Sequence, residues 1–344
     1  MKIKKTIVTK DIDKYTLVAS LNKTYNPIAG DAAIFEIIEP GKHITVQSDS
    51  KRNVAIFPGD YIMAAFADRY ATSQFEGYVP ETPQDVYHIL GAGGAIGIVK
   101  SKNYALKDIE PTTLKLVGYC CDENGKVLNT KFYKKQLSEF NASVPFETKI
   151  VLSVGSTMDS GKTTTAAFVA RGLKTTGKKV AFIKFTGTCY TKDKDFVLDC
   201  GADVAVDFSD MGFPSTFMCS KKDLLNLYQS LINSLVKERP DYIVMEIADG
   251  LLQRETNFLL KSKEFMSTIH SVVFSCGDSL SAFYGIQLLK EFGVTPAFIS
   301  GLFTMSPLLI EEVKQNCSVP VLTIDELMTG EFNHLFINSV SVAA

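Results

Sequence analysis

The chain has 344 residues, of which 46% are apolar and 22% charged, so it is long enough for two domains that each bury a core. Its 36 basic and 38 acidic residues leave a formal charge of -2, which excludes net charge as a means of binding nucleic acid or an anionic membrane surface. We therefore expect neither nucleic acid nor a membrane as a partner.

The cysteines and the first residues bear on the cellular compartment. Seven cysteines are present, without a Cys-x-x-Cys pair and without the density of a disulfide-stapled secreted domain. The first residues, MKIKKTIVTKDIDKY, are basic and contain no apolar stretch of signal-peptide length. We expect free thiols and a soluble, cytoplasmic protein.

Residues 1–146 are predicted to form a smaller β-rich domain, a barrel or a sandwich, with a connector at its end. Short apolar runs there are separated by turn sequences such as Pro58-Gly59-Asp60. The polar stretch Lys134–Glu147 is expected to be a helical connector, so that the second domain is residues 147–344. Strands are expected at residues 33–38, 43–46, 54–57, 95–99 and 114–119.

A glycine-rich stretch, Gly91-Ala92-Gly93-Gly94-Ala95-Ile96-Gly97, lies inside the β-rich region. Glycines in series also occur in dinucleotide-binding loops, but here the last glycine has the wrong spacing and no βαβ unit surrounds it. A glycine-rich β-turn is the better interpretation.

The second domain is predicted to be an α/β fold with a mostly parallel sheet. Continuous apolar strands that alternate with helices are typical of a parallel sheet covered on both faces. Strands are expected at residues 149–154, 179–185, 242–246, 271–275, 295–300 and 319–323, and helices at residues 162–176, 221–238, 279–292 and 307–316.

One junction in this domain predicts a phosphate-binding loop. Gly161-Lys162-Thr163 follows a buried strand and opens a helix, which is the context that such a loop requires. Backbone N–H groups and the helix N-terminus attract phosphate oxygens, Lys162 reaches the terminal phosphates, and the Thr163 hydroxyl can bind Mg²⁺. The expected nucleotide-binding residues are Gly155, Ser156, Thr157, Met158, Asp159, Ser160, Gly161, Lys162, Thr163 and Thr164.

Five residues separate Gly155 from Gly161, one more than in the strict phosphate-loop pattern. With this extra residue, Gly155-Ser156-x4-Gly161-Lys162-Thr163 resembles the loop of dethiobiotin synthetase and its relatives in the signal-recognition, MinD and BioD class of P-loop NTPases. The resemblance covers roughly residues 149–325. It implies a nucleotide with Mg²⁺ as cofactors and a homodimer, although Glu246-Ile247-Ala248-Asp249-Gly250 lacks the Glu-Gly-Ala-Gly-Gly run of dethiobiotin synthetase.

Three further residues are candidates for the site. Lys184 ends a predicted strand, at the sheet edge where open α/β folds bind ligands, and is similar to a functional lysine of the same class. Glu246 ends another apolar strand, where an unpaired carboxylate would be costly, so a metal or a lysine partner is expected. Lys162, Lys184 and Glu246 are thus the expected catalytic residues, and Thr163, Glu246 and Asp195 the expected Mg²⁺ ligands, with Asp195 suggested by the resemblance.

The function expected from these residues is an Mg²⁺-dependent enzyme that binds and hydrolyses a nucleoside triphosphate. No Asn-Lys-x-Asp guanine reader is present, which favours ATP and leaves GTP as the alternative. The enzyme would activate a small-molecule acceptor by phosphoryl transfer or ligation. Two alternatives remain open: an assembly or metallochaperone switch factor that acts on a protein partner, and a nucleotide-sensing scaffold.

Overall fold

The chain forms two compact units in the computed structural model, which describes residues 2–133, 136–145 and 147–336. The first unit comprises Met1–Gln136, Gly187–Thr191 and Phe208–Met218, and the second comprises Leu137–Thr186, Lys192–Asp207 and Cys219–Ala344. The division differs from the one expected near residue 146. The first unit ends earlier in the sequence and takes in two segments of the later chain.

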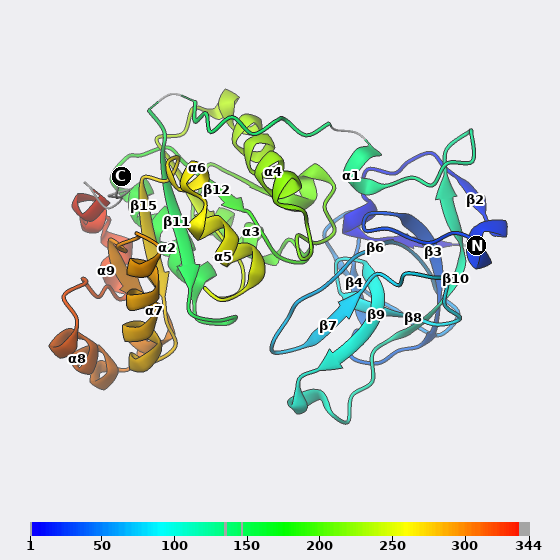
Figure 1. Ribbon diagram of the computed structural model, residues 1–344, viewed down its shortest axis with the longest axis horizontal. Coiled ribbons are helices and arrows are strands. Elements are labelled where there is room, and N and C mark those ends of the chain that lie inside the picture. Colours follow the sequence, from blue (N-terminus) through cyan, green and yellow to red (C-terminus); the bar gives the residue numbers. More distant parts are fainter. Residues whose placement is uncertain (1, 134–135, 146, 337–344) are drawn as a thin grey trace. The chain divides into compact units, whose positions relative to one another are not determined.

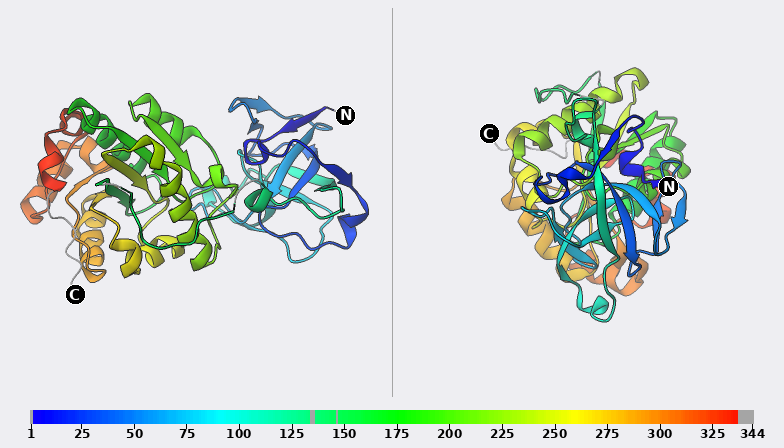
Figure 2. Two further views of the ribbon diagram at one scale, coloured as in Figure 1. Left: turned by 90° about the horizontal axis from the view of Figure 1, so that it is seen from above. Right: turned by 90° about the vertical axis from the view of Figure 1, so that its right-hand side faces the viewer.

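The first unit is built around a closed β-barrel (Figure 2). The ring runs through β6 (Tyr61–Phe66), β3 (Ala32–Glu39), β10 (Thr113–Cys121), β8 (Tyr87–Gly91) and β9 (Ala95–Lys102), and β9 pairs back onto β6. Its other strands are β1 (Ile3–Lys5), β2 (Thr16–Val18), β4 (Thr45–Gln47), β5 (Asn53–Ala55) and β7 (Phe75–Tyr78), and one short helix follows, α1 (Thr130–Tyr133). The expected β-rich domain is therefore confirmed as a barrel.

The barrel interior is filled by aromatic side chains. Phe35, Phe66 and Tyr87 are fully buried, and their rings meet edge to face with centroids 5.5–5.7 Å apart. Aromatic pairs in this geometry contribute about 1 kcal/mol each beyond the apolar area they bury. The barrel thus has a core of its own.

The two later segments belong to the first unit because they hydrogen-bond within it. Thr188 and Ser215 form a β-bridge that joins the two segments to each other. The Gln47 amide group donates to Thr191 Oγ1 at 2.8 Å and accepts from the Thr191 N–H at 3.0 Å. Lys10 pairs with Asp210 at 2.7 Å. These partners are remote in sequence, so composition along the chain could not predict the assignment.

The second unit is a parallel sheet between helices, as expected (Figure 1). Its six strands are all parallel to their neighbours, in the order β13 (Val204–Asp207), β12 (Val180–Lys184), β14 (Tyr242–Glu246), β11 (Lys149–Gly155), β15 (Ser271–Ser275) and β16 (Phe298–Ser300). The helices are α2 (Lys162–Thr175), α3 (Lys192–Asp199), α4 (Lys221–Ser234), α5 (Arg254–Lys261), α6 (Lys263–Met266), α7 (Ser279–Glu291), α8 (Pro307–Asn316) and α9 (Ile324–Thr329).

Helix α2 packs on this sheet through small residues. Ala166 and Ala170 are fully buried in one cluster with Val151, Phe182 and Val244 of the central strands. The short side chains allow the helix to lie close to the strands, which fixes the position of its N-terminus beside their carboxyl ends. The packing of α2 therefore positions the loop that precedes it.

The connector differs from its expected structure. Residues 136–145 are not helical, and residues 134, 135 and 146 lie outside the described part of the chain. Side chains of α4 accept hydrogen bonds from the backbone of the connector. The Ser138 N–H donates to Ser230 Oγ at 2.8 Å, and the Phe140 N–H donates to Asn226 Oδ1 at 3.0 Å. Because these bonds satisfy the backbone without a helix, the prediction of a helical connector was wrong.

The end of the chain also differs from expectation. The stretch 319–323 was expected to be a strand, but there Val321 makes only an isolated parallel bridge to Ile299.

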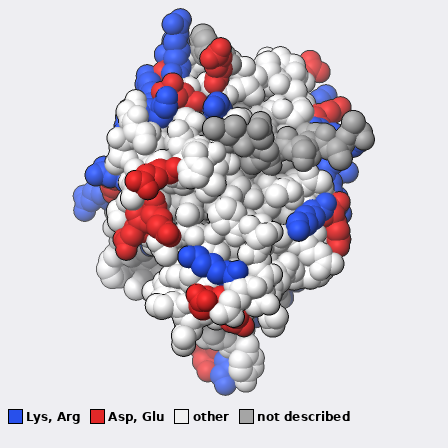
Figure 3. All heavy atoms as spheres, turned by 90° about the vertical axis from the view of Figure 1, so that its left-hand side faces the viewer, with Lys and Arg blue, Asp and Glu red and all other residues white. Residues whose placement is uncertain are grey.

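On the face of the second unit shown in Figure 3, acidic and basic side chains are interspersed. None of the helices in the described ranges has the length and hydrophobicity to cross a membrane.

Candidate functional site

The loop between β11 and α2 reverses the chain through two left-handed residues. Asp159 has a φ of 62° and Gly161, the residue before the helix, a φ of 95°. A Cβ atom on Gly155 would overlap Ser160 Oγ and lie 2.6 Å from Cγ of Lys162. Only glycine fits at these two positions without strain, Gly161 for its φ and Gly155 for its lack of space.

Several backbone N–H groups of this loop have no protein acceptor among the described residues. Ser156 donates its N–H to the Ser275 carbonyl at 2.9 Å, which ties the loop to β15. Among the hydrogen bonds of the described residues, none is donated by the backbone N–H of Asp159, Gly161, Lys162 or Thr163. Unpaired N–H groups at a helix N-terminus, with its positive partial charge, form a binding site for anions.

Lys162 is buried beside these amides. It is 5% exposed, and its ammonium donates to the Thr157 carbonyl of the same loop at 2.7 Å. Burial and, to a lesser degree, nearby Lys184 lower its pKa to about 8, against the opposing effect of Glu246 and two aspartates. A buried ammonium that has only a carbonyl as its partner is poised to bind an anion.

Two strand ends and the helix start meet at one carboxylate. Glu246 ends β14 in register with Lys184 of β12 and with Ser153 of β11. Its Oε1 atom accepts from Thr163 Oγ1 at 2.9 Å and from the Lys184 ammonium at 2.6 Å. The expected lysine partner of Glu246 is therefore present. Because Thr163 donates its proton to Glu246, the lone pairs of its oxygen remain available to a cation.

Two buried oxygen atoms at the site have no protein partner. Glu246 is 1% exposed, and in the described part of the structure its Oε2 atom accepts no hydrogen bond. Ser160 Oγ, in the loop, is likewise buried and unpaired among the described residues. Orphaned buried polar atoms of this kind are costly unless a ligand satisfies them. The oxygen donors of Thr163 and Glu246 match the preference of Mg²⁺.

Lys184 is further held by an aspartate that the sequence did not single out. Asp193 Oδ2 lies 2.7 Å from the Lys184 ammonium, and the two carboxylates raise the pKa of Lys184 although burial opposes them. The neighbouring Lys194 pairs with Asp207, at the end of β13, at 2.9 Å. Asp195, the residue expected to bind Mg²⁺, lies two positions after Asp193 in α3, and its role as a Mg²⁺ ligand stays a prediction.

The segment that follows β14, residues 247–250, packs against the phosphate loop. A Cβ atom on Gly250 would overlap the Ser156 carbonyl and lie 3.0 Å from the Cα atom of Thr157. The Ala248 N–H donates to Thr186 Oγ1 at 2.8 Å, which links this segment to the end of β12. The backbone of residues 247–250 is thus held directly beside the loop.

The structure places all the expected loop residues, 155–164, in one loop and one helix start, and adds Lys184 and Glu246 to them. Within the described residues there is no group of three or more His, Cys, Asp or Glu side chains that could hold a metal ion. The seven cysteines are thiols rather than disulfides, as expected. This arrangement can bind a polyanion between the loop amides and Lys162, next to the Glu246 carboxylate and the Thr163 hydroxyl group.

Comparison with known proteins gives structural similarity only. No family model matches the chain, and the search of curated proteins gives no match. Among solved structures, the chain is similar to the signal recognition particle receptor FtsY from Elizabethkingia anophelis in complex with GDP, with 16% identity over 58% of this chain and 66% of that one and a TM-score of 0.38.

Two other solved structures are similar to the same extent. Hydrogenase maturation factor HypB from Archaeoglobus fulgidus is 13% identical over 55% of this chain and 91% of its own, with a TM-score of 0.38. A DUF1611 family protein from Anabaena variabilis is 13% identical over 63% and 65%, with a TM-score of 0.41. Similarity of this degree identifies neither a family nor an activity for the chain.

Proposed function

We propose that the second unit binds a nucleoside triphosphate with Mg²⁺ at the loop between β11 and α2, and cleaves or transfers its terminal phosphate. The observation that carries this proposal is the buried Lys162 ammonium, 2.7 Å from a carbonyl of its own loop and surrounded by unpaired amides. A triphosphate gives these groups acceptors that the protein does not supply.

The chain's own residues would contribute charge and position. Loop amides and Lys162 would hold the phosphates, and the Lys162 ammonium would exchange the Thr157 carbonyl for a phosphate oxygen. Thr163 and Glu246 would hold Mg²⁺, which neutralises developing charge on the phosphates when it is bound. The unpaired Oε2 atom of Glu246 is available to orient the attacking group.

Lys184 would position the acceptor. Its ammonium is held by Glu246 at 2.6 Å and by Asp193 at 2.7 Å, at the carboxyl end of the sheet where open α/β folds bind ligands. Release from Asp193 would free one N–H donor for an acceptor carboxylate or phosphate while the bond to Glu246 remains. We therefore propose a small-molecule acceptor that is phosphorylated or ligated, and ATP as the donor because the sequence lacks an Asn-Lys-x-Asp guanine reader.

A switch factor that acts on a protein partner is the second candidate, and one observation favours it. The chain segments that follow Lys184 and Asp207, at the ends of β12 and β13, belong to the first unit. A change at these two strand ends would therefore be transmitted along the chain into the barrel. In this candidate, slow hydrolysis of GTP or ATP would set the state of the barrel, and a homodimer or another protein would be the partner.

Nucleotide binding is tested by calorimetric titration of the whole chain with ATP, GTP and their non-hydrolysable analogues in the presence of Mg²⁺. We expect Lys162→Ala to weaken binding on the order of 100-fold, because a buried charge-assisted contact to phosphate is lost. Lys314→Ala, an exposed lysine on α8, is the matched control and should bind as the unaltered chain does. Equal affinities of the two variants would refute the assigned site.

The two candidate functions are separated by what stimulates turnover. Phosphate release that rises only when a small carboxylic acid or amine is added supports the enzyme. Release that stays slow with such compounds and rises with a second protein supports the switch factor. Sedimentation of the chain with and without nucleotide tests the proposed homodimer.

A further inference from the structure

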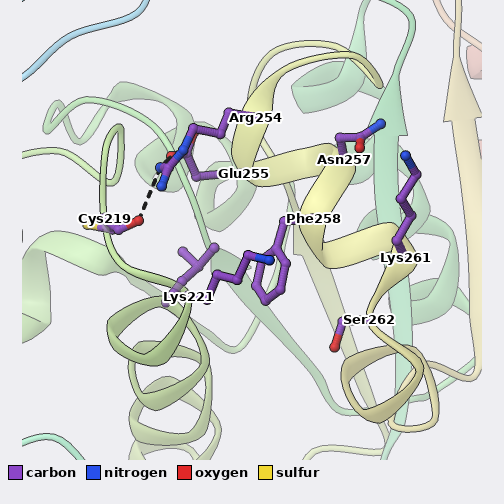
Figure 4. Close-up of a pocket in the computed structure, with 9 residues that line it drawn as sticks. Cys219, Lys221, Arg254, Glu255, Asn257, Phe258, Lys261 and Ser262 are labelled. Carbon is purple, nitrogen blue, oxygen red and sulfur yellow. Dashed lines mark hydrogen bonds and ion pairs between the residues drawn. The ribbon is translucent and has the colours of Figure 1, made fainter.

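A second cavity lies in the second unit, between the start of α4 and helix α5 (Figure 4). Its volume is about 400 Å³, enough for a small organic molecule. The phosphate loop and Lys184 are not among its lining residues, so it is separate from the proposed nucleotide site. The residues that line it are Cys219, Lys221, Leu224, Arg254, Glu255, Asn257, Phe258, Lys261 and Ser262.

Polar contacts join the walls of this cavity. Arg254 donates to the Cys219 carbonyl at 3.1 Å, which joins α5 to the segment before α4 (Figure 4). Arg254 also pairs with the buried carboxylate of Glu255. Gln253 caps the helix, because its side-chain oxygen accepts from the N–H groups of Glu255 at 2.8 Å and Thr256 at 3.0 Å. The walls are thus fixed by the protein itself, as in a preformed site.

The charges that remain at the cavity are positive. Glu255, the carboxylate in the lining, is matched by Arg254, which leaves the ammonium of Lys221. The ammonium of Lys261, the other lysine of the lining, lies 4.9 Å from the centre of the Phe292 ring, which is outside the cavity. The Lys221 ammonium lies 4.8 Å from the centre of the Phe258 ring. No carboxylate in the described part of the chain pairs with either lysine. The Lys221 ammonium at the cavity is therefore available to an external anion.

One wall of the cavity is apolar. Leu224 is buried, and Phe258 faces the cavity between the two helices. Asn257 and Ser262 add an amide and a hydroxyl group that can donate hydrogen bonds. An apolar wall, a few polar groups and a cation are together the features of a binding site for a small amphipathic acid.

We propose that this cavity binds a small organic anion, with its apolar part against Leu224 and Phe258 and its acidic group at Lys221. A carboxylate and a phosphate ester both have the required chemistry. The site is independent of the nucleotide site, but the chain connects the two closely. Arg254 lies only four positions after Gly250, which packs on the phosphate loop, and four residues span at most about 14 Å.

The test uses benzoate and phenyl phosphate as probes, titrated into the nucleotide-free chain and followed by calorimetry. Saturable binding of either probe is expected, and the tighter of the two identifies the acidic group. Lys221→Glu should weaken it about tenfold or more, because an attraction becomes a repulsion at short range. Lys222→Glu is the matched control, since Lys222 is exposed, adjacent and outside the cavity, and should change the affinity less than twofold.

Two further variants test the apolar wall and the separation of this cavity from the phosphate loop. Phe258→Ala should weaken both probes through the lost apolar wall, and a melting curve of each variant shows whether it is folded. Lys162→Ala should leave probe binding unchanged, whereas its loss in that variant would place the probe in the phosphate loop. Absence of saturable binding for both probes, or equal effects of Lys221→Glu and Lys222→Glu, would also overturn the proposal.

Discussion

The molecule contains two turns with essential glycines that differ in what they can bind. The turn Gly91–Gly94 in the first unit joins β8 to β9, and the loop from Gly155 to Gly161 in the second unit joins β11 to α2. Both contain left-handed glycines, with φ of 101° at Gly94 and 95° at Gly161. The first is followed by a strand and the second by a helix.

The backbone of the first turn is used by the protein itself. Its carbonyl groups at Ala92, Gly93 and Gly94 accept from the N–H groups of Gln47, Val8 and Ala65 at 2.7, 3.2 and 3.0 Å. In the second loop, carbonyl groups are used as well, since Ser160 accepts from the Leu302 N–H at 3.2 Å. The N–H groups of Gly161, Lys162 and Thr163, however, donate to no acceptor among the described residues. The comparison teaches that glycine content alone does not make a phosphate site. The following helix, with its unpaired amides, makes the difference.

Two glycine substitutions, one in each turn, should give the largest difference between the turns. Gly155→Ala should weaken nucleotide binding on the order of 100-fold, because its Cβ atom would displace Ser160 and Lys162. Gly93→Ala should instead destabilise the fold by about 2 to 3 kcal/mol, because its Cβ atom would overlap the Cys189 carbonyl in a packed region. Calorimetric titration and denaturant unfolding of both variants measure the two effects. A loss of nucleotide affinity in folded Gly93→Ala equal to that in Gly155→Ala would contradict the distinction.

A substitution of Glu246 tests whether the site beside the second loop acts in phosphate release. Glu246→Gln keeps the shape of the side chain but removes the negative charge beside Thr163 and Lys184. We expect phosphate release to fall about 100-fold, with nucleotide affinity changed less than tenfold, because the carboxylate acts mainly as charge builds up in the transition state. Glu311 is an exposed acid on α8, and Glu311→Gln is therefore the control for phosphate-release rates measured with Mg²⁺. Unchanged turnover in Glu246→Gln would remove this residue from the mechanism.

The pH dependence of nucleotide binding gives the smallest effect. Burial lowers the pKa of Lys162 to about 8, below the 10.5 of an exposed lysine, so its ammonium loses the proton as the pH rises above 8. A triphosphate favours the protonated form, so binding above this pH must take up a proton. The dissociation constant should therefore rise about tenfold per pH unit above pH 8 and be level below about pH 7.

The arginine variant Lys162→Arg provides the control for the pH profile. Its guanidinium stays charged throughout this range, so its dissociation constant should not change between pH 7 and 10, whatever its absolute value. A level profile for the unaltered chain as well would mean that Lys162 does not titrate on binding.

Much of the second unit could be predicted from the sequence because its signals are local. The apolar runs that become β11, β14 and β15 are continuous and buried on both faces, and Gly161-Lys162-Thr163 stands where a strand meets a helix. A metal or a lysine partner was expected for Glu246, and Lys184 is this lysine because both residues end parallel strands, whose ends meet at one edge of the sheet.

The remaining features depend on contacts between residues remote in sequence. The sequence does not distinguish Asp193 from Asp195 as a partner of Lys184. The start and direction of α3 bring Asp193 to Lys184. The connector was expected to be helical from its polarity, but the Ser230 and Asn226 side chains of α4 bind its backbone. Likewise, the bonds of Gln47 to Thr191 place a piece of later sequence in the barrel unit.

Hydrogen exchange of the backbone amides with and without a non-hydrolysable nucleotide and Mg²⁺ tests the central claim most directly. If the amides of residues 157–164 bind the phosphates, exchange there should slow markedly on nucleotide addition, while the amides of residues 91–94 should exchange as before. Unchanged exchange at residues 157–164 under conditions in which nucleotide is bound would contradict the account, because the triphosphate would then lie elsewhere.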